Sequence, residues 1–186
     1  MKDRITKLIK KSFETYKVSY KTLRDTDEVT MFVTGFELED KNNIVAQVYI
    51  YDDHLKLQGT LPNPVRYPHR NSVSEFLQRA NSSVKLGYYL FDYTDFTINF
   101  VFTFRPATEY TEEDFRDDIS VVVQMLEYIL SPVKQIAGGY IGPEEALEIF
   151  KGGTVVEENN SVRGSSEGSE LQTGEKDNTG RNDSSD

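Results

Sequence analysis

The chain contains no cysteine and no tryptophan among its 186 residues, and only two histidines. Without cysteine it forms no disulfides, thiolate nucleophiles or cysteine-based zinc sites. No apolar run approaches the roughly 20 residues that a membrane-spanning helix needs. The basic start, MKDRITKLIKKSF, is not followed by the apolar stretch of a signal peptide. We therefore expect a cytoplasmic protein with no membrane span.

Negative charge is in excess, but it is distributed unevenly along the chain. The net charge is −10, yet residues 1–24 carry eight Lys and Arg against two acids, a local net of +6. Residues 25–156 carry −11 and residues 157–186 carry −5. A body this acidic repels phosphates, so the composition argues against nucleic acid as a partner.

The apolar content is sufficient for one folded domain and falls away near the C-terminus. Hydrophobic residues make up 37% of the chain and aromatic residues 12%. A domain of this size buries about 70% of the surface of its unfolded chain, so no disulfide or metal is needed to hold it. From about Glu157 the chain consists mainly of Ser, Gly, Asn and acidic residues, a composition typical of disorder. We predict one domain over residues 1–153 and a disordered acidic tail over residues 154–186.

Hydrophobic periodicity and turn residues predict the order of the elements. A strongly acidic first turn after Thr111 favours a long helix, which Pro132 should kink or end early and Gly138-Gly139 should stop. Gly152-Gly153 should close the last helix. The expected elements are a helix over 3–16, strands over 29–38, 44–51 and 54–60, a helix from 72, strands over 88–91 and 97–104, a helix from 111 and a short helix over 142–150. This order, α-βββ-α-ββ-α-α, predicts an α+β fold in which helices pack on one face of an antiparallel sheet of about five strands.

Residues 72–92, SVSEFLQRANSSVKLGYYLFD, contain the most informative pattern in the chain. Asn71 or Ser72 could cap a helix whose apolar stripe comprises Val73, Phe76, Leu77 and Ala80. The helix ends in Arg79-Ala-Asn81, and a Leu86-Gly87 turn leads into an aromatic strand. This layout resembles that of the YbjN family of bacterial proteins, often described as sensory transduction regulators.

The resemblance spans roughly residues 3–150 in the order of elements and implies a YbjN-like fold. Its motif positions are Phe76, Leu77, Arg79, Asn81, Leu86 and Gly87. The same architecture and acidity are similar to those of the type III secretion chaperones, which are usually dimeric. That second likeness rests on topology and charge alone.

Two interpretations of Arg79 and Asn81 are open. They could line a ligand site between the helix and the sheet, or Asn81 could cap the helix in a left-handed conformation and bond the following turn. We favour the structural interpretation, because a helix end beside a tight turn leaves carbonyl groups that need partners. Gly87 is expected at a positive φ or at a close approach of backbone.

No arrangement of residues indicates catalysis, a metal or a cofactor. His54 and His69 are isolated, and no H-x-x-x-H or H-E-x-x-H spacing occurs. The carboxylate pairs, such as Asp52 and Asp53, are explained as turn formers or helix N-terminal charges. Gly138, Gly139 and Gly142 precede a helix, but they lack the phosphate-loop pattern. Glu144 places negative charge at the start of that helix, where an anion would bind. We therefore expect no enzyme activity and no cofactor.

Two of the predicted strands are apolar on both faces. Along residues 29–38 and 44–51 aromatic side chains alternate with aliphatic ones, so helices can cover only one of the two apolar faces. A second subunit is the simplest cover for the other face or a strand edge. The alternative is that the N-terminal helix and the proline-rich crossing over residues 62–68 cover it within one chain. The residues predicted for that surface are Phe32, Phe36, Tyr49 and Tyr51.

These features together predict a non-enzymatic protein-interaction module, a YbjN-like regulator or chaperone-like protein that binds a segment of a partner protein and could form a homodimer. One alternative is a dedicated secretion chaperone. Another is a small-ligand binder or enzyme that uses Arg79 and Asn81. The sequence does not specify the identity of the partner.

Overall fold

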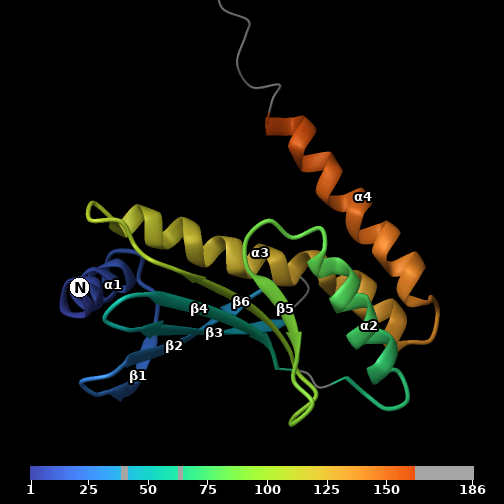
Figure 1. The fold of residues 1–186 in the computed structure, drawn as a ribbon, viewed down its shortest axis with the longest axis horizontal. Coiled ribbons are helices and arrows are strands. Elements are labelled where there is room, and N and C mark those ends of the chain that lie inside the picture. Colours follow the sequence, from blue (N-terminus) through green and yellow to red (C-terminus); the bar gives the residue numbers. More distant parts are fainter. Residues whose placement is uncertain (39–41, 63–64, 162–186) are drawn as a thin grey trace, which may run out of the picture.

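The computed structural model describes residues 1–38, 42–62 and 65–161, with the backbone alone from residue 153 onward. Helices and strands alternate in short groups along this part of the chain (Figure 1). The elements are α1 (Lys2–Thr15), β1 (Tyr20–Asp25), β2 (Thr30–Glu37), β3 (Asn43–Ile50), β4 (Leu55–Leu61), α2 (Arg70–Asn81), β5 (Tyr88–Phe91), β6 (Ile98–Phe104), α3 (Glu112–Ala137) and α4 (Pro143–Ser161).

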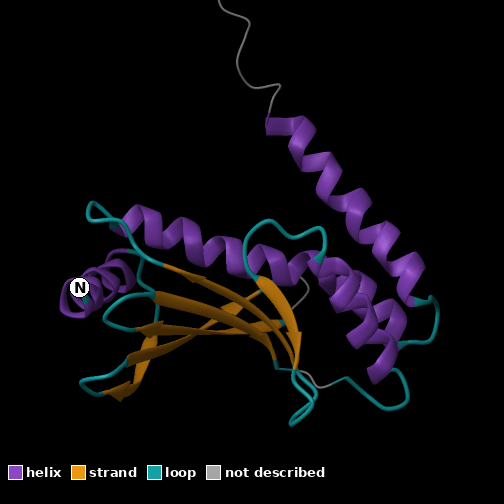
Figure 2. Cartoon of the chain, in the orientation of Figure 1, coloured by secondary structure: helices purple, strands orange, loops and turns teal. Residues whose placement is uncertain are grey.

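The six strands form one antiparallel sheet in the order β1-β2-β3-β4-β6-β5. The first four strands form a meander, and β6 inserts between β4 and β5. Helices α1 and α3 lie along one face of the sheet, α2 packs beside β5, and α4 packs on α2 and α3 (Figures 1 and 2). The predicted α+β class, with an antiparallel sheet and helices on one face, is confirmed.

The sheet has six strands rather than about five, because β1 was not predicted. The residues of β1 after Tyr20 are all exposed, so the strand lacks the apolar alternation by which strands are recognised. Its register on β2 shifts between Thr22 and Arg24, which leaves Leu23 in a bulge.

The core lies between the sheet and the helices, and aromatic rings join its layers. Phe13 of α1 meets Phe32 of β2 and Phe115 of α3 edge to face, with ring centroids 6.0 and 5.6 Å apart. Helix α3 crosses the sheet closely at Gly59, where an added Cβ would lie 2.7 Å from the side chains of both Val122 and Leu126. A larger residue at position 59 would therefore push α3 away from β4.

Two helix ends differ from their predicted positions, the start of α2 and the end of α4. Helix α2 begins at Arg70, before both predicted caps, because the Val73 N–H already donates to the carbonyl oxygen of His69 at 3.0 Å. Helix α3 begins as expected, with a capping box between Thr111 and Asp114, but it continues through the buried Pro132 to Ala137.

Helix α4 also runs further than predicted, since it continues through Gly152-Gly153 to Ser161. Glycine in a helix costs only about 1 kcal/mol relative to alanine, so two glycines weaken a helix without ending it. Residues 154–161 of the predicted tail are thus helical, and the remainder, 162–186, lies outside the described residues. The last turns of α4 extend beyond the body of the protein (Figure 1).

Candidate functional site

The predicted interaction residues lie on opposite faces of the sheet. Phe32 is fully buried under the helices, and Phe36 is on the same face, partly buried against the core. Tyr49 and Tyr51 are on the other face. The placement of Phe32 on an interaction surface is therefore wrong, because its side chain belongs to the layer that holds α1 and α3 on the sheet.

We call the helix-free side of the sheet the open face, and its residues follow from the strand register. They form three rows across the strands and a short fourth row, in which Glu37 pairs with Asn43. The first row is Arg24, Met31, Tyr49, Lys56 and Thr103; the second is Lys21, Val33, Gln47, Gln58, Val101 and Tyr88; the third is Gly35, Val45, Thr60, Asn99 and Leu90.

The open face differs in charge from the rest of the protein. Its rows contain three cations, Lys21, Arg24 and Lys56, and one carboxylate, Glu37 at the end of β2, although the chain as a whole carries −10. Apolar and aromatic side chains occupy about half of the positions in these rows. A surface with aromatic residues and few charges of the common sign is typical of the core of an interface.

Tyr49 is near the centre of the first row, and neighbouring side chains hold it in place. Its hydroxyl donates to Oε1 of Gln47 at 3.0 Å, and Nζ of Lys56 lies 4.8 Å from its ring centroid. Partial burial, together with the nearby Tyr51, raises the pKa of the Tyr49 hydroxyl above its usual 10.0. The hydroxyl therefore remains protonated at neutral pH.

A small polar network stiffens the third row. Oδ1 of Asn99 accepts from Nε2 of Gln58 at 3.0 Å and from Oγ1 of Thr60 at 2.5 Å. Asn99 is 3% exposed, and the adjacent Val101 is 2% exposed although no helix packs on this face. Neighbouring side chains therefore already cover part of β6, and the accessible section of the open face lies over β2, β3 and β4.

The free edge of β5 is closed by Asn81 at the end of α2. Nδ2 of Asn81 donates to the carbonyl oxygen of Tyr89 at 2.9 Å, and Oδ1 accepts from the Tyr89 N–H at 2.6 Å. The amide side chain thus takes the place of a neighbouring strand. This arrangement protects the edge from pairing with another chain.

The structure supports a structural role for Asn81, although not the predicted conformation. Asn81 is the last residue of α2, and the following Ser82 is right-handed, with φ −67° and ψ −19°. Gly87 does adopt the expected positive φ, at +77°. Leu86, beside it, is 58% exposed, whereas Phe76 and Leu77 are buried in the core under α2.

Arg79 and Asn81 do not form a common site. The guanidinium of Arg79 pairs with Glu75 on its own helix at 2.6 Å and with Glu144 of α4 at 3.5 Å. Asn81 points instead to β5. The structure therefore does not bring these two side chains together.

The edge strand β1 is protected by other means. It carries a bulge at Leu23 and the charged residues Lys21 and Arg24, all of which hinder the pairing of another strand.

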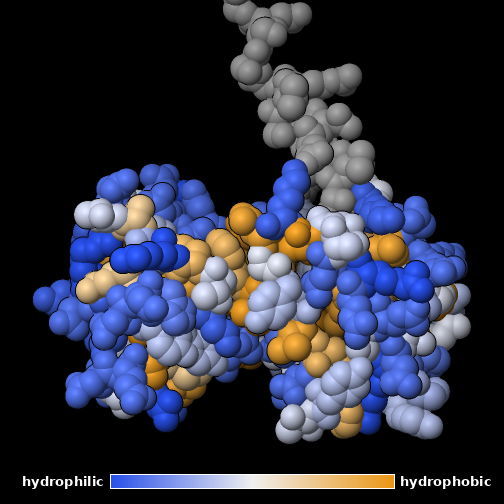
Figure 3. Space-filling model, viewed as in Figure 1, coloured by the Kyte–Doolittle hydropathy of each residue, from blue (hydrophilic) through white to orange (hydrophobic). Residues whose placement is uncertain are grey.

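Exposed apolar side chains gather near the middle of the molecule, over α3 and beside β5 (Figure 3). Tyr88 and Leu90 of β5 are 49% and 45% exposed at the margin of the open face.

The two histidines lie apart. Nδ1 of His54 is 2.6 Å from Oδ1 of Asp53 in an exposed turn, and the His54 ring stacks on Tyr51 with centroids 4.3 Å apart. That hydrogen bond lowers the pKa of the Asp53 carboxyl below 3.8. Within the described ranges, no group of three or more His, Cys, Asp or Glu side chains is arranged to hold a metal ion.

The carboxyl group of Asp118 on α3 makes the free energy of unfolding depend on pH. The Tyr110 hydroxyl donates to Oδ2 of Asp118 at 2.6 Å. Partial burial raises the pKa of Asp118 above 3.8; the bond from Tyr110 opposes this shift, whereas the charges of Asp114 and Asp117 add to it. The folded state thus holds the Asp118 proton more tightly than the unfolded state. The resulting stabilisation is complete below pH 3.8 and is lost as the pH rises through the folded-state pKa.

Asp118→Asn is therefore expected to raise the free energy of unfolding at pH 7 by less than about 1 kcal/mol, since water screens the partly exposed carboxylate. The gain should shrink as the pH falls through the pKa of Asp118. Urea unfolding at several pH values measures both effects, with the exposed Asp27→Asn as control. A variant less stable than the parent at pH 7 would contradict the prediction.

Comparisons with known proteins concern the fold. No family model matches the sequence, and no curated protein matches it. The fold resembles that of YbjN. The crystal structure of YbjN, described as a candidate transcription regulator from E. coli, aligns with a TM-score of 0.47 and 10% identity over 72% of this chain and 89% of that chain.

That match concerns the arrangement of elements alone. The likeness to type III secretion chaperones stays a prediction. Within the part of the chain that the structure describes, no helix combines the length and the apolar character that crossing a bilayer requires.

Sequence reasoning found Tyr49 but not its basic neighbours on the open face. Arg24 lies on the strand that was not predicted. The signal for Lys56 was present, because Lys56 and Gln58 alternate with the buried Leu55 and Leu57 along β4. That alternation identifies the polar side of β4, and through the register it places Lys56 beside Tyr49.

Proposed function

We propose that this chain is a non-enzymatic protein-interaction module that binds an acidic segment of a partner protein across its open face. The observation that supports this most directly is the first row of the open face. Met31 and Tyr49 lie side by side there, between Arg24 on β1 and Lys56 on β4. An apolar and aromatic pair flanked by cations suits a segment that combines an apolar side chain with carboxylates.

The edges of the sheet support binding on the face rather than strand addition. The side chain of Asn81 forms hydrogen bonds with the N–H and the carbonyl oxygen of Tyr89 on β5, and a bulge interrupts β1. A partner strand could pair with β5 only by displacing the Asn81 side chain, and with β1 only past the bulge. Both features are typical of edges protected against pairing. Side-chain recognition on the open face requires no such change.

Charge favours a different partner over a second copy of the chain. In a symmetric dimer two open faces would meet, and each of them carries Lys21, Arg24 and Lys56 against the single carboxylate Glu37. Like charges brought together at an interface are unfavourable. A carboxylate-bearing segment meets the opposite sign, and such attraction mainly increases the rate of association.

The proposal is tested by charge reversal on the open face. Arg24→Glu/Lys56→Glu should reduce the capture of a partner from native lysate by at least tenfold, roughly the effect of losing one or two interfacial ion pairs. Lys7→Glu/Arg105→Glu makes the same change in net charge at exposed positions elsewhere, and it should capture as well as the parent. Circular dichroism confirms that both variants fold.

Equal capture by both double variants would contradict binding at the open face. The oligomeric state, measured by analytical ultracentrifugation, separates a further outcome. If the parent is a dimer that Arg24→Glu/Lys56→Glu dissociates, the open face serves self-association instead.

A further inference from the structure

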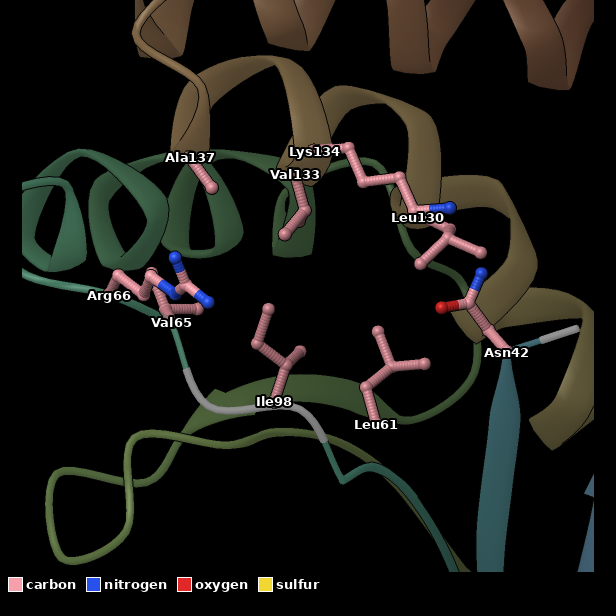
Figure 4. Close-up of a pocket in the computed structure, with 9 residues that line it drawn as sticks. All are labelled: Asn42, Leu61, Val65, Arg66, Ile98, Leu130, Val133, Lys134 and Ala137. Atoms are coloured by element: carbon pink, nitrogen blue, oxygen red, sulfur yellow. The ribbon is translucent and has the colours of Figure 1, made fainter. Parts of the chain in front are cut away.

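A second site lies on the other side of the sheet, in a cavity between the C-terminal half of α3 and the ends of β4 and β6. Its volume is about 220 Å³, and most of its wall is apolar (Figure 4). The apolar residues are Leu61, Val65, Ile98, Leu130, Val133 and Ala137. A cavity of about 150 Å³ with such a lining is known to remain dry and to take up benzene. This cavity therefore has room for a ligand whose apolar part contains about six carbon atoms.

Among the described residues, the polar groups that line the cavity are basic or neutral. Arg66, Lys134 and Asn42 complete this described part of the lining, which includes no acidic residue, although the protein as a whole carries −10. The guanidinium of Arg66 turns toward the cavity from one end, and Lys134 and Asn42 lie at the other (Figure 4). Arg66 forms no ion pair with any residue that the structure describes.

The backbone on both sides of Arg66 is held in place. The N–H of Val65 donates to the carbonyl oxygen of Phe96 at 2.8 Å, and the carbonyl oxygen of Val65 accepts from Nε of Arg70 at 2.9 Å. The carbonyl oxygen of Arg66 accepts from the His69 N–H at 3.2 Å. The base of the Arg66 side chain is thus fixed at the cavity, and less ordering is needed when a ligand binds.

We propose that this cavity binds a small organic carboxylate with a short aliphatic or aromatic body. The body lies between Leu61 and Ile98 on the sheet and Leu130 and Val133 on α3, and the carboxylate accepts hydrogen bonds from the guanidinium of Arg66. The planar guanidinium matches the geometry of a carboxylate. The apolar wall contributes affinity, and the charge of Arg66 selects acids over neutral molecules of the same shape.

Hexanoate and 1-hexanol are matched probes for this proposal, because they share one alkyl chain and differ in charge. Isothermal titration calorimetry on the full chain should show hexanoate binding at least about tenfold more tightly than hexanol, the effect of one charged hydrogen bond. Arg66→Gln should remove this preference and leave hexanol binding unchanged. Arg105→Gln, an exposed control, should change neither.

Ala137→Phe fills the cavity from the last turn of α3, and it should abolish binding of both probes. Methyl NMR of the parent chain locates the site independently of any variant, with the largest shifts expected for Leu61, Ile98 and Val133. Equal affinity for hexanoate and hexanol, no binding of either, or shifts confined to the open face would each overturn the proposal. These results do not depend on whether the open face binds a protein.

Discussion

Replacement of Asn81 by alanine is expected to lower the free energy of unfolding by about 2–3 kcal/mol. The substitution removes both hydrogen bonds to the backbone of Tyr89, a residue that is 3% exposed. A buried donor or acceptor left without a partner costs about 1–3 kcal/mol. Urea unfolding, followed by circular dichroism, measures the loss.

The same substitution should also open the edge of β5 to other chains. With the amide side chain gone, the N–H and carbonyl of Tyr89 become available for pairing, so concentration-dependent self-association should increase. Gln78→Ala is the matched control, because Gln78 is exposed on the same helix. A stability change below about 0.5 kcal/mol for Asn81→Ala, the range of ordinary surface substitutions, would show that water replaces the side chain at little cost.

Replacement of Gly87 by alanine should be at least as damaging, with an expected loss of about 2–4 kcal/mol. Its φ of +77° costs an L-residue about 1–2 kcal/mol. The added Cβ would also lie 2.5 Å from the carbonyl oxygen of Val101 and 2.7 Å from the ring of Phe100. The first of these atoms belongs to the central backbone of β6, which cannot move without disturbing its pairing with β4 and β5.

Gly152→Ala is the control, and its effect should have the opposite sign. An added Cβ at Gly152 would meet nothing within 4 Å, and the residue lies inside α4. Alanine there should stabilise the helix by up to about 1 kcal/mol. Thermal unfolding of both variants in one buffer compares them. If Gly87→Ala unfolds at the same temperature as the parent, the turn before β5 must adjust more readily than its geometry indicates.

The sequence predicts most of the elements because their periodicity and turn residues act locally. The sheet class follows from alternation along residues 98–104 and 55–61, and the start of α3 follows from Thr111 and the acids after it. Gly87 could likewise be assigned a positive φ from the Leu-Gly turn alone. Each of these features depends on neighbours within a few residues.

The face to which a residue belongs could not be predicted for β2. Its side chains are apolar at both Phe32 and Val33, so the pattern does not distinguish the covered side from the open one. A shift of one residue exchanges the two faces of a strand. Only pairing with β3, whose Val48 is opposite Phe32 and whose Gln47 is opposite Val33, shows which side the helices cover.

The cavity beside α3 could not be predicted for a different reason. Its lining comes from β4, the chain before α2, β6 and α3, segments that are far apart in the sequence. Arg66 has no motif around it that indicates a ligand. Its role depends on the backbone bonds that hold Val65 and on the place where α3 crosses the sheet.

The position of β6 between β4 and β5 has a consequence for the order in which the chain folds. The meander from β1 to β4 pairs neighbours along the chain and can form early, whereas β6 and α3 join it through contacts between distant residues. Leu61 ends β4 and Ala137 ends α3. At about 5–20 residues per second, a ribosome needs roughly 4–15 s to make the chain between them. For that interval the nascent meander displays much of the apolar face that α3 later covers, which makes it a substrate for chaperones until α3 emerges.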